Sequence, residues 1–349
     1  MPGSKHKNKK ATPKRKGENR KTKFRRKVSW VALSVAGIWF ALSAIGDWYV
    51  HHPREWLAGN KSVFTRPLEY FGYRFAVITD AIGLTGHDTV YSFDEPAPEG
   101  RIFFAGAPVR VKAPAPEDIV TIVRNEFAVG WSPSLKHPVW AAYHVTPQVR
   151  HEDADRPNFQ KDRGVKNSPP ANAYAHSGYD RGHMVPNHAI VTRYGAEEQK
   201  LTFLMSNIAP QRASLNRGVW RELEHRIADL WSRKYGELWV IAGNVSEPRC
   251  KQTISGYGID VPNSFYMIIV GQSGDEVRSL ALLFEQETPY GIYPLANIVT
   301  IGELEEKTGL DFLSELPKFI QRPLESDRPT RLWPIRLRDI FKLISLRCE

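Results

Sequence analysis

The stretch Tyr179-Asp180-Arg181-Gly182-His183 decides the fold and the chemistry expected of this 349-residue chain. His183 suits a general base, because histidine is the side chain whose unperturbed pKa lies nearest neutrality. Arg181 can present a planar fork of donors to phosphate oxygens, and Gly182 leaves room for a backbone or a ligand to approach. A base beside a phosphate clamp indicates hydrolysis of a phosphodiester, whose negative charge otherwise repels hydroxide.

A helix is predicted downstream, over residues 216–235. Its apolar residues recur at helical spacing and form one stripe: Val219, Trp220, Leu223, Ile227, Leu230 and Trp231. At about 100° per residue, Asn216 projects onto the middle of this stripe and Glu224 onto its edge. Arg217, Arg221 and His225 project onto the opposite face.

Asn216 and Glu224 have the side chains of a magnesium site. Mg²⁺ takes oxygen ligands in near-octahedral geometry and keeps several waters, so the amide oxygen of Asn216 is a sufficient protein ligand. Glu224, two turns further along the helix, is placed to hold waters of the ion's hydration shell. A neutral ligand such as Asn216 leaves the full charge of the ion for the departing oxygen.

Each of these residues has a simpler explanation when it is considered alone. Asn216 could be the N-cap of its helix, a position that asparagine often occupies. Glu224 could be a solvated residue at the helix edge, and Gln211 a loop residue after Pro210. We favour the catalytic interpretation, because a base, a phosphate clamp, an amide ligand and a carboxylate follow one another in a coherent pattern.

Histidines near the motif offer a second interpretation of the same region. His176, His183 and His188 could form a zinc cluster with Asp180, since imidazole and carboxylate both ligate zinc. The spacing matches no common zinc module, and no cysteine joins the group. We therefore expect His176 and His188 to be loop residues or neighbours of the site.

Three sequence blocks resemble the DNA/RNA non-specific endonucleases, the family of sugar-non-specific bacterial nucleases and mitochondrial endonuclease G. The first block is residues 179–186 with the Asp-Arg-Gly-His motif, and the second is residues 206–211. The third is Asn216 with Trp220, Leu223 and Glu224. Weaker similarity at residues 127–143 and 304–312 extends the resemblance to roughly residues 126–315, and the set of motifs is specific.

The resemblance implies an α+β fold, a ββα-metal (His-Me finger) nuclease domain with a mixed, largely antiparallel sheet. It implies His183 as the general base, Arg181 as a ligand of the scissile phosphate, and Asn207 as a residue that orients the base or the ion's waters. It further implies Asn216 as the direct Mg²⁺ ligand and Glu224 as a ligand through water. Mn²⁺ is the expected substitute for Mg²⁺.

An upstream arginine also contacts phosphate in this family, and Arg156 is the best match, with Arg163 close by. The net charge of +10 does not itself indicate nucleic-acid binding, because residues 1–27 carry thirteen Lys or Arg against one Glu. The remaining residues have a net charge of −2 (+10 minus +12). Local basic groups must then contact the phosphates, and the candidates are Arg156, Lys161, Arg163, Lys166, Arg181, Arg212 and Arg217.

Residues 28–46 form an uncharged segment of about the length that a helix needs to cross a bilayer. The preceding basic tail, residues 1–27, favours a cytoplasmic N-terminus and places the catalytic domain on the other side. A cleaved signal peptide ending near Ala41-Leu42-Ser43 is the alternative. We expect a single-pass anchor with the domain in a bacterial periplasm rather than a mitochondrial intermembrane space.

The expected layout is a tail at 1–27, a transmembrane anchor at 28–46, a juxtamembrane segment and linker at 47–125, an endonuclease domain at 126–315 and a basic extension at 316–349. Other expected features are a helix at 67–84, a strand at 101–111, strands at 237–244, 264–271 and 277–284, and a short helix at 335–346. Whether Cys250 and Cys348 form a disulfide is left open, because two cysteines alone do not establish a pairing.

Two functions compete at this stage. The first is a membrane-anchored, Mg²⁺-dependent endonuclease that cuts DNA and RNA with little sequence preference. The second is a membrane-anchored receptor that binds nucleic acid on the same domain without cutting it. The expected partners are DNA and RNA through phosphate contacts and the lipid bilayer through residues 28–46, and a homodimer is left open. Intact His183, Asn216 and Glu224 favour the enzyme.

Overall fold

A computed structural model of the chain describes residues 37, 66–84, 86–92, 100–151, 154–247, 252–340 and 342–343. The chain divides into two compact units, Met1–Tyr49 with Lys61–Ala76, and Val50–Asn60 with Val77–Glu349. The expected membrane anchor at 28–46 lies outside the described residues except for Gly37. Among the described residues, no helix combines the length and the apolar character that crossing a membrane requires.

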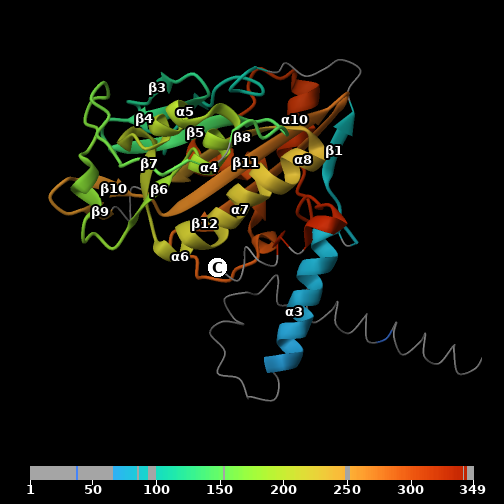
Figure 1. The fold of residues 1–349 in the computed structure, drawn as a ribbon. Coiled ribbons are helices and arrows are strands. Elements are labelled where there is room, and N and C mark those ends of the chain that lie inside the picture. Colours follow the sequence, from blue (N-terminus) through green and yellow to red (C-terminus); the bar gives the residue numbers. More distant parts are fainter. Residues whose placement is uncertain are drawn as a thin grey trace, which may run out of the picture. The chain divides into compact units, whose positions relative to one another are not determined.

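An eight-stranded antiparallel sheet is the centre of the second unit (Figure 1). Its strands are β1 (Thr89–Ser92), β3 (Val120–Val123), β4 (Phe127–Ser132), β5 (His137–Val145), β8 (Glu237–Val245), β11 (Ser264–Ser273), β12 (Glu276–Glu285) and β13 (Ile298–Val299). The order is β1-β12-β11-β8-β5-β4-β3, and β13 also pairs with β12. The expected α+β class and the three strands predicted after the helix are therefore confirmed.

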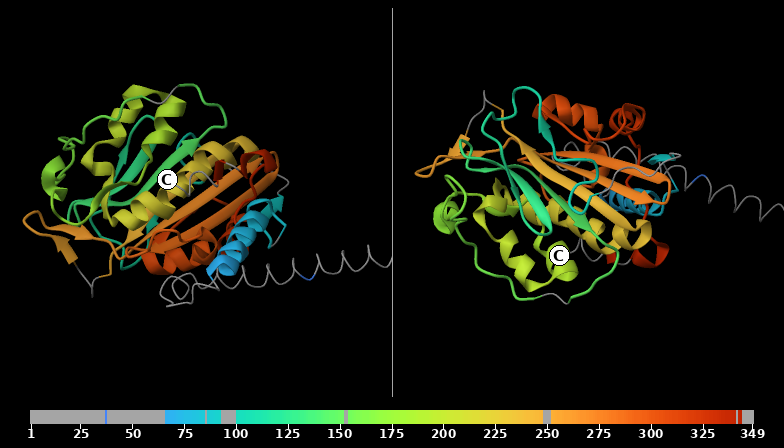
Figure 2. Two further views of the ribbon diagram at one scale, coloured as in Figure 1. Left: turned by 60° about the horizontal axis from the view of Figure 1, so that its bottom comes forward. Right: turned by 90° about the horizontal axis from the view of Figure 1, so that it is seen from above.

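Helices cover both faces of this sheet, which explains why its central strands are buried on both sides. They are α4 (Asn187–Tyr194), α5 (Ala196–Thr202), the helical run Ala213–Tyr235, α9 (Ile301–Thr308) and α10 (Lys318–Ser326). Trp140 and Tyr266 pack in one cluster with apolar residues of α9 and α10. Phe265 projects to the opposite face and contacts Trp220 at 5.8 Å between ring centroids. Figure 2 shows α4–α8 on one face and α9 and α10 on the other.

A short ribbon and a long helix form the ββα unit that the motifs predicted. β6 (Asp180–His183) pairs antiparallel with β7 (Ile208–Gln211), and His183 lies opposite Ile208. The helical run consists of α6 (Ala213–Leu215), η3 (Asn216–Trp220), α7 (Arg221–His225), η4 (Arg226–Trp231) and α8 (Ser232–Tyr235), in which η3 and η4 are π-helical. The predicted apolar stripe from Val219 to Trp231 is buried against the sheet.

Smaller elements complete the described structure. They are α3 (Arg66–Ala81), β2 (Val109–Arg110), η1 (Ala171–Tyr174), η2 (Met205–Asn207), β9 (Gln252–Ile254), β10 (Ile259–Val261), η6 (Pro294–Asn297), β14 (Leu310–Asp311) and η7 (Leu337–Asp339). The helix expected at 67–84 is confirmed as α3. Within the segment expected to form a strand from 101 to 111, only β2 is a strand. A turn closed by the Gly100 N–H to Phe103 carbonyl bond and the positive φ of Gly106 prevent continuous pairing.

One open question and one further expectation fall wholly or partly outside the described residues. Cys250 and Cys348, whose pairing the sequence leaves open, both lie outside them. The helix expected at 335–346 overlaps the 3₁₀ turn η7, but residues 341 and 344–346 are also outside.

Gly243 provides a test of the close packing in the central strands. A methyl group at this position of β8 would overlap the Tyr266 hydroxyl and lie 2.6 Å from the Val139 carbonyl oxygen. We expect Gly243→Ala to lower the free energy of unfolding by about 1–3 kcal/mol in urea titrations, because overpacking displaces core groups. Gly164→Ala is the control, since its added methyl would meet only Asp162 at 3.8 Å. Equal stabilities of the two variants would contradict this account.

Candidate active site

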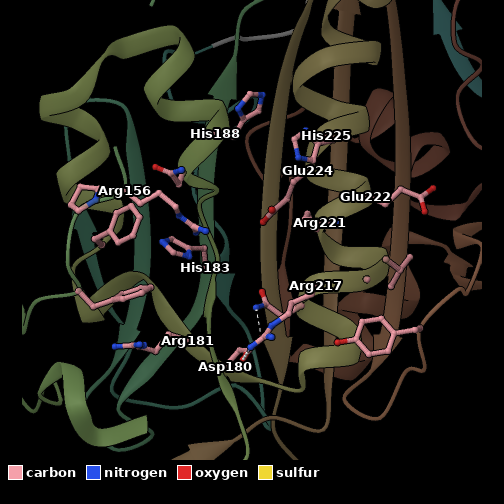
Figure 3. Close-up of a pocket in the computed structure, with 18 of the residues that line it drawn as sticks. Arg156, Asp180, Arg181, His183, His188, Arg217, Arg221, Glu222, Glu224 and His225 are labelled. Atoms are coloured by element: carbon pink, nitrogen blue, oxygen red, sulfur yellow. Dashed lines mark hydrogen bonds and ion pairs between the residues drawn. The ribbon is translucent and has the colours of Figure 1, made fainter. Parts of the chain in front are cut away.

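A cleft of about 1350 Å³ brings the motif residues together. One wall consists of β6, the start of α4 and the loop at 154–159, and the opposite wall is the helical run from Asn216 to His225. Figure 3 shows Arg156 and His183 of one wall and Glu224 of the other turned toward the space between the walls. Residues 290–292 form part of the rim.

His183 is held between two phenylalanine rings. The ring centroid of Phe159 lies 5.3 Å and that of Phe203 4.9 Å from the imidazole centroid. An arginine also packs over each phenylalanine ring. The guanidinium carbon of Arg181 lies 4.4 Å from the centroid of Phe159, and that of Arg156 lies 5.7 Å from the centroid of Phe203. The imidazole of His183 therefore sits in an aromatic slot with a cationic group at each side. The two rings hold the imidazole by packing, and its buried Nε2 has no hydrogen-bond partner among the described residues.

Burial controls the protonation state of His183, whose residue is 8% exposed. Desolvation, and next the positive charges of Arg156 and Arg181, lower the pKa of His183 to about 3. The imidazole is consequently neutral at physiological pH, which is the form that can accept a proton. The same arginines favour an anion in front of the ring.

Tight packing across the β6–β7 ribbon sets the position of His183. A methyl group on Gly182 would overlap the side-chain amide of Gln211, so only glycine permits the two strands to pack in this way. Asn207 is fully buried, and its amide accepts a bond from the Val185 N–H and donates to the carbonyls of Val185 and Thr202. Gln211 and Asn207 are thus packing and bonding residues of the segment that carries His183.

Asp180 joins the ribbon to the helix. Its carboxylate accepts a 2.9 Å bond from Asn216 Nδ2 and bonds of 2.7 and 2.6 Å from the guanidinium of Arg217. Although burial raises it, the hydrogen bonds from Arg217 and Asn216 lower the pKa of Asp180 overall. Because the amide nitrogen of Asn216 is used in this contact, the amide oxygen is left to act as an acceptor or a ligand. Sequence analysis assigned Asp180 no such role.

Glu224 faces His183 from the opposite wall of the cleft (Figure 3). The carboxyl is partly buried, and desolvation raises its pKa to about 8 although His188 and Arg156 lower it. Ionisation of this partly buried carboxyl is unfavourable unless a cation lies nearby. The group is therefore suited to bind a cation. Asn216 and Glu224 together offer the neutral and acidic oxygen donors that Mg²⁺ accepts.

The cleft contains most of the residues singled out from the sequence. His183, Arg181, Arg156, Asn216 and Glu224 all line it. Asn207 does not line the cleft and bonds to the segment that follows His183. Among the other basic candidates, Arg217 lines the cleft, whereas Lys161, Arg163, Lys166 and Arg212 are not among its lining residues.

The ideal-helix projection placed Arg217, Arg221 and His225 on the helix face opposite Asn216 and Glu224. This placement is wrong, because all five residues line the cleft. The physical reason is the irregular helix. Gly218 has non-helical dihedral angles of φ −97° and ψ −117° within a π-helical turn, so the angle per residue departs from the ideal 100°. The sequence signal for this irregularity is Gly218 itself.

The alternative zinc cluster of His176, His183, His188 and Asp180 is not formed. Asp180 bonds to Asn216 and Arg217, and within the described residues His176 joins no group of metal-ligating side chains. His188 lies instead near His225 and Asp229 of the helix. Sequence analysis missed this grouping, because the two segments lie far apart along the chain.

Comparisons with known proteins identify relatives of this chain. Residues 106–319 match the DNA/RNA non-specific endonuclease family. The chain belongs to this family. The nuclease of Serratia marcescens is 29% identical over 223 residues, which are 59% of this chain and 80% of that protein. A nuclease of a Nostoc strain is 30% identical over 60% of this chain and 78% of its own length.

Human mitochondrial endonuclease G is a further relative of this family member. It is 27% identical over 210 residues, which cover 55% of this chain and 69% of that protein. A crystal structure of the EndoG/EndoGI complex has the same fold, with a TM-score of 0.52 and 23% identity over 57% of this chain and 87% of that chain. Family membership makes the chain a nuclease that hydrolyses phosphodiester bonds.

Glu224 gives this endonuclease a distinct dependence of stability on pH. Its pKa is about 8 in the folded protein and near the ordinary 4.5 in the unfolded chain, so between these values the folded state holds a proton that the unfolded state releases. Stability from this group is therefore lost as pH rises from 4.5 to 8. We expect Glu224→Gln to be more stable than the wild type at pH 8, on the order of 2 kcal/mol, and equally stable at pH 5.

Urea unfolding of the metal-free protein at the two pH values measures this difference. Glu222→Gln is the control on the same helix, because Glu222 forms a buried 2.9 Å ion pair with Arg226. Loss of that pair should destabilise the protein at both pH values. A Glu224→Gln variant that gains no stability at pH 8 relative to pH 5 would show that the carboxyl is not destabilised in the folded cleft.

Proposed function

We propose that this nuclease is a Mg²⁺-dependent endonuclease that cuts DNA and RNA with little sequence specificity. The observation that carries the proposal is the placement of His183 opposite Glu224 in one cleft that Arg156, Arg181 and Asn216 also line. A base, cationic phosphate ligands and oxygen donors for a cation then surround a single volume. This is the set of groups that hydrolysis of a phosphodiester needs.

His183 acts as the general base in this proposal. Its neutral imidazole accepts a proton from the attacking water, and the aromatic slot of Phe159 and Phe203 keeps the ring in position. A phosphate bound by Arg156 and Arg181 offsets the positive field of the two guanidinium groups. The pKa of His183 then rises from its low value in the free cleft, which strengthens the base when substrate is present.

Asn216 and Glu224 fit an oxygen-coordinated divalent cation. Asn216 would hold the ion through its amide oxygen, which the Asp180 contact leaves available, and Glu224 would hold it through water. Mg²⁺, or Mn²⁺ in its place, would supply positive charge for the phosphoryl group and the departing 3′ oxygen. Asp180 keeps the Asn216 amide in the required orientation.

Low sequence specificity follows from the chemistry of the lining residues. Arg156, Arg181, Arg217 and Arg221 all line the cleft and suit phosphate oxygens, which are the same in every nucleotide. Phosphate contacts set the register of a nucleic acid without reading its bases. DNA and RNA are therefore both substrates in this proposal.

His183→Ala tests the assigned base. We expect the variant to cut supercoiled plasmid and RNA about 100- to 10,000-fold more slowly than the wild type, the usual contribution of a general base. Cleavage should require Mg²⁺ and stop with EDTA. Gel assays with the full-length chain under both conditions measure the rates.

His176→Ala is the matched control, because this exposed histidine lies outside the cleft lining. It should cut at the wild-type rate. Undiminished cutting by His183→Ala would remove the imidazole from the mechanism. Binding without cleavage by the wild type would replace the enzyme with the alternative, a non-catalytic receptor.

We also propose that residues 28–46 anchor the nuclease in a membrane, with the catalytic domain on the non-cytoplasmic side. The supporting observation is an uncharged segment of bilayer length after a strongly basic tail. The periplasmic rather than mitochondrial location stays a prediction, and the homodimer stays open.

Deletion of residues 28–46 tests the anchor. We expect the full-length chain to stay in the membrane pellet after an alkaline carbonate wash and the deleted chain to leave it, because the apolar segment holds the protein in the bilayer. N-terminal sequencing of the mature full-length protein distinguishes the alternative. A mature chain that begins near Ser43 and is released from the membrane would identify a cleaved signal peptide.

A further inference from the structure

Two histidines and an aspartate meet at the edge of the cleft, outside the group of residues that the proposed reaction uses. His188 lies in α4, His225 ends α7, and Asp229 lies one turn further in η4. The His188 Nε2 atom is 3.1 Å from each carboxylate oxygen of Asp229, and His225 Nδ1 is 2.9 Å from Oδ2. The two imidazole centroids are 5.0 Å apart. We refer to these residues as the His-Asp-His triad.

The spacing of the triad matches the spacing of ligands around a small transition-metal ion. Zinc bonds to imidazole nitrogen and carboxylate oxygen at about 2.0–2.1 Å, which places neighbouring ligand atoms of a tetrahedron roughly 3.3 Å apart. One ligand atom from each triad residue lies within 4.8 Å of the others. The 2.9 and 3.1 Å nitrogen–oxygen contacts would lengthen by a few tenths of an ångström to match this spacing, and the two imidazole rings would turn toward the shared ion.

Helices fix the triad in place. His225 and Asp229 are four residues apart, so their side chains project from the same side of the helix. His188 comes from the opposite wall, and Figure 3 shows it across the cleft from His225. The side chains are 26%, 28% and 24% exposed for His188, His225 and Asp229, so an ion in solution can reach them.

We propose that His188, His225 and Asp229 form a second metal site, which binds a divalent transition ion of the Zn²⁺ class and ties the two cleft walls together. Two imidazole nitrogens and one carboxylate oxygen suit Zn²⁺, whereas Mg²⁺ prefers oxygen ligands alone. Three protein ligands leave a position for water. The site shares no ligand with the proposed Mg²⁺ site of Asn216 and Glu224, and its existence does not depend on the proposed function.

The competing account of the same contacts is a hydrogen-bonded network without an ion, in which Asp229 bridges two histidines. Calorimetric titration of the EDTA-stripped full-length chain with ZnCl₂ separates the two accounts. We expect one Zn²⁺ per chain to bind at the triad, with a rise in Tm as the Zn²⁺ concentration increases. Co²⁺ in place of Zn²⁺ should give the visible absorption of a nitrogen-ligated, low-symmetry site.

Substitution of each helix ligand locates the binding site. We expect His225→Gln and Asp229→Asn to weaken Zn²⁺ binding by at least about 100-fold, since even residues that support metal ligands contribute about 10- to 100-fold. Both variants should also lose the Tm rise and the Co²⁺ absorption. Circular dichroism of the metal-free variants checks that the chain is folded, and either folded variant is sufficient for the test.

Two controls exclude other sites on the chain. Asn216→Ala should retain Zn²⁺ binding, because Asn216 belongs to the separate oxygen site. Glu305→Gln should retain it as well, since Glu305 belongs to the second group of possible ligands, with Asp311 and Glu325. Zn²⁺ binding that is absent from the wild type, or that persists in folded His225→Gln and Asp229→Asn, would overturn the proposal. Neither result would alter the outcome of the His183→Ala cleavage assay.

Discussion

The contact of Asp180 with Asn216 and Arg217 is the interaction on which the geometry of the cleft depends. Asp180 begins the short ribbon that carries His183, and its two partners begin the long helix that carries Glu224. A displacement of the ribbon relative to the helix would break three hydrogen bonds to a charged group, which are stronger than bonds between neutral groups. The carboxylate thus fixes the separation of the two walls and the orientation of the Asn216 amide.

Burial shifts the two facing titratable groups in opposite directions. His183 has its pKa lowered to about 3 and Glu224 has its pKa raised to about 8, so desolvation makes both neutral in the free cleft. In the function proposed here, the uncharged imidazole accepts a proton and the carboxyl exchanges its proton for a cation. Such pKa shifts lower the stability of the free protein in part of the pH range. A loss of stability of this kind is common at functional sites.

Irregular helical geometry determines which side chains reach the cleft. The helical run contains π-helical turns at Asn216–Trp220 and Arg226–Trp231. Its apolar stripe stays buried, while the polar residues beside the stripe turn toward the cleft. An ideal helix would separate Arg221 from Asn216 on its surface. The observed helix lets both line one cleft, and π-helical turns often occur at functional sites for this reason.

Sequence by itself determined the secondary structure around the cleft and singled out five residues that line it. The strands β8, β11 and β12 and the helix after Asn216 follow from local periodicity, and the Asp-Arg-Gly-His motif carries its chemistry in adjacent positions. Only the tertiary structure decided that Asp180 orients Asn216, that Arg221 lines the cleft, and that His188 meets His225 and Asp229. These contacts join residues 36 and 41 positions apart, and such distances leave no periodic trace in the chain. They arise because packing of the ribbon and the helix on one sheet brings the two segments together.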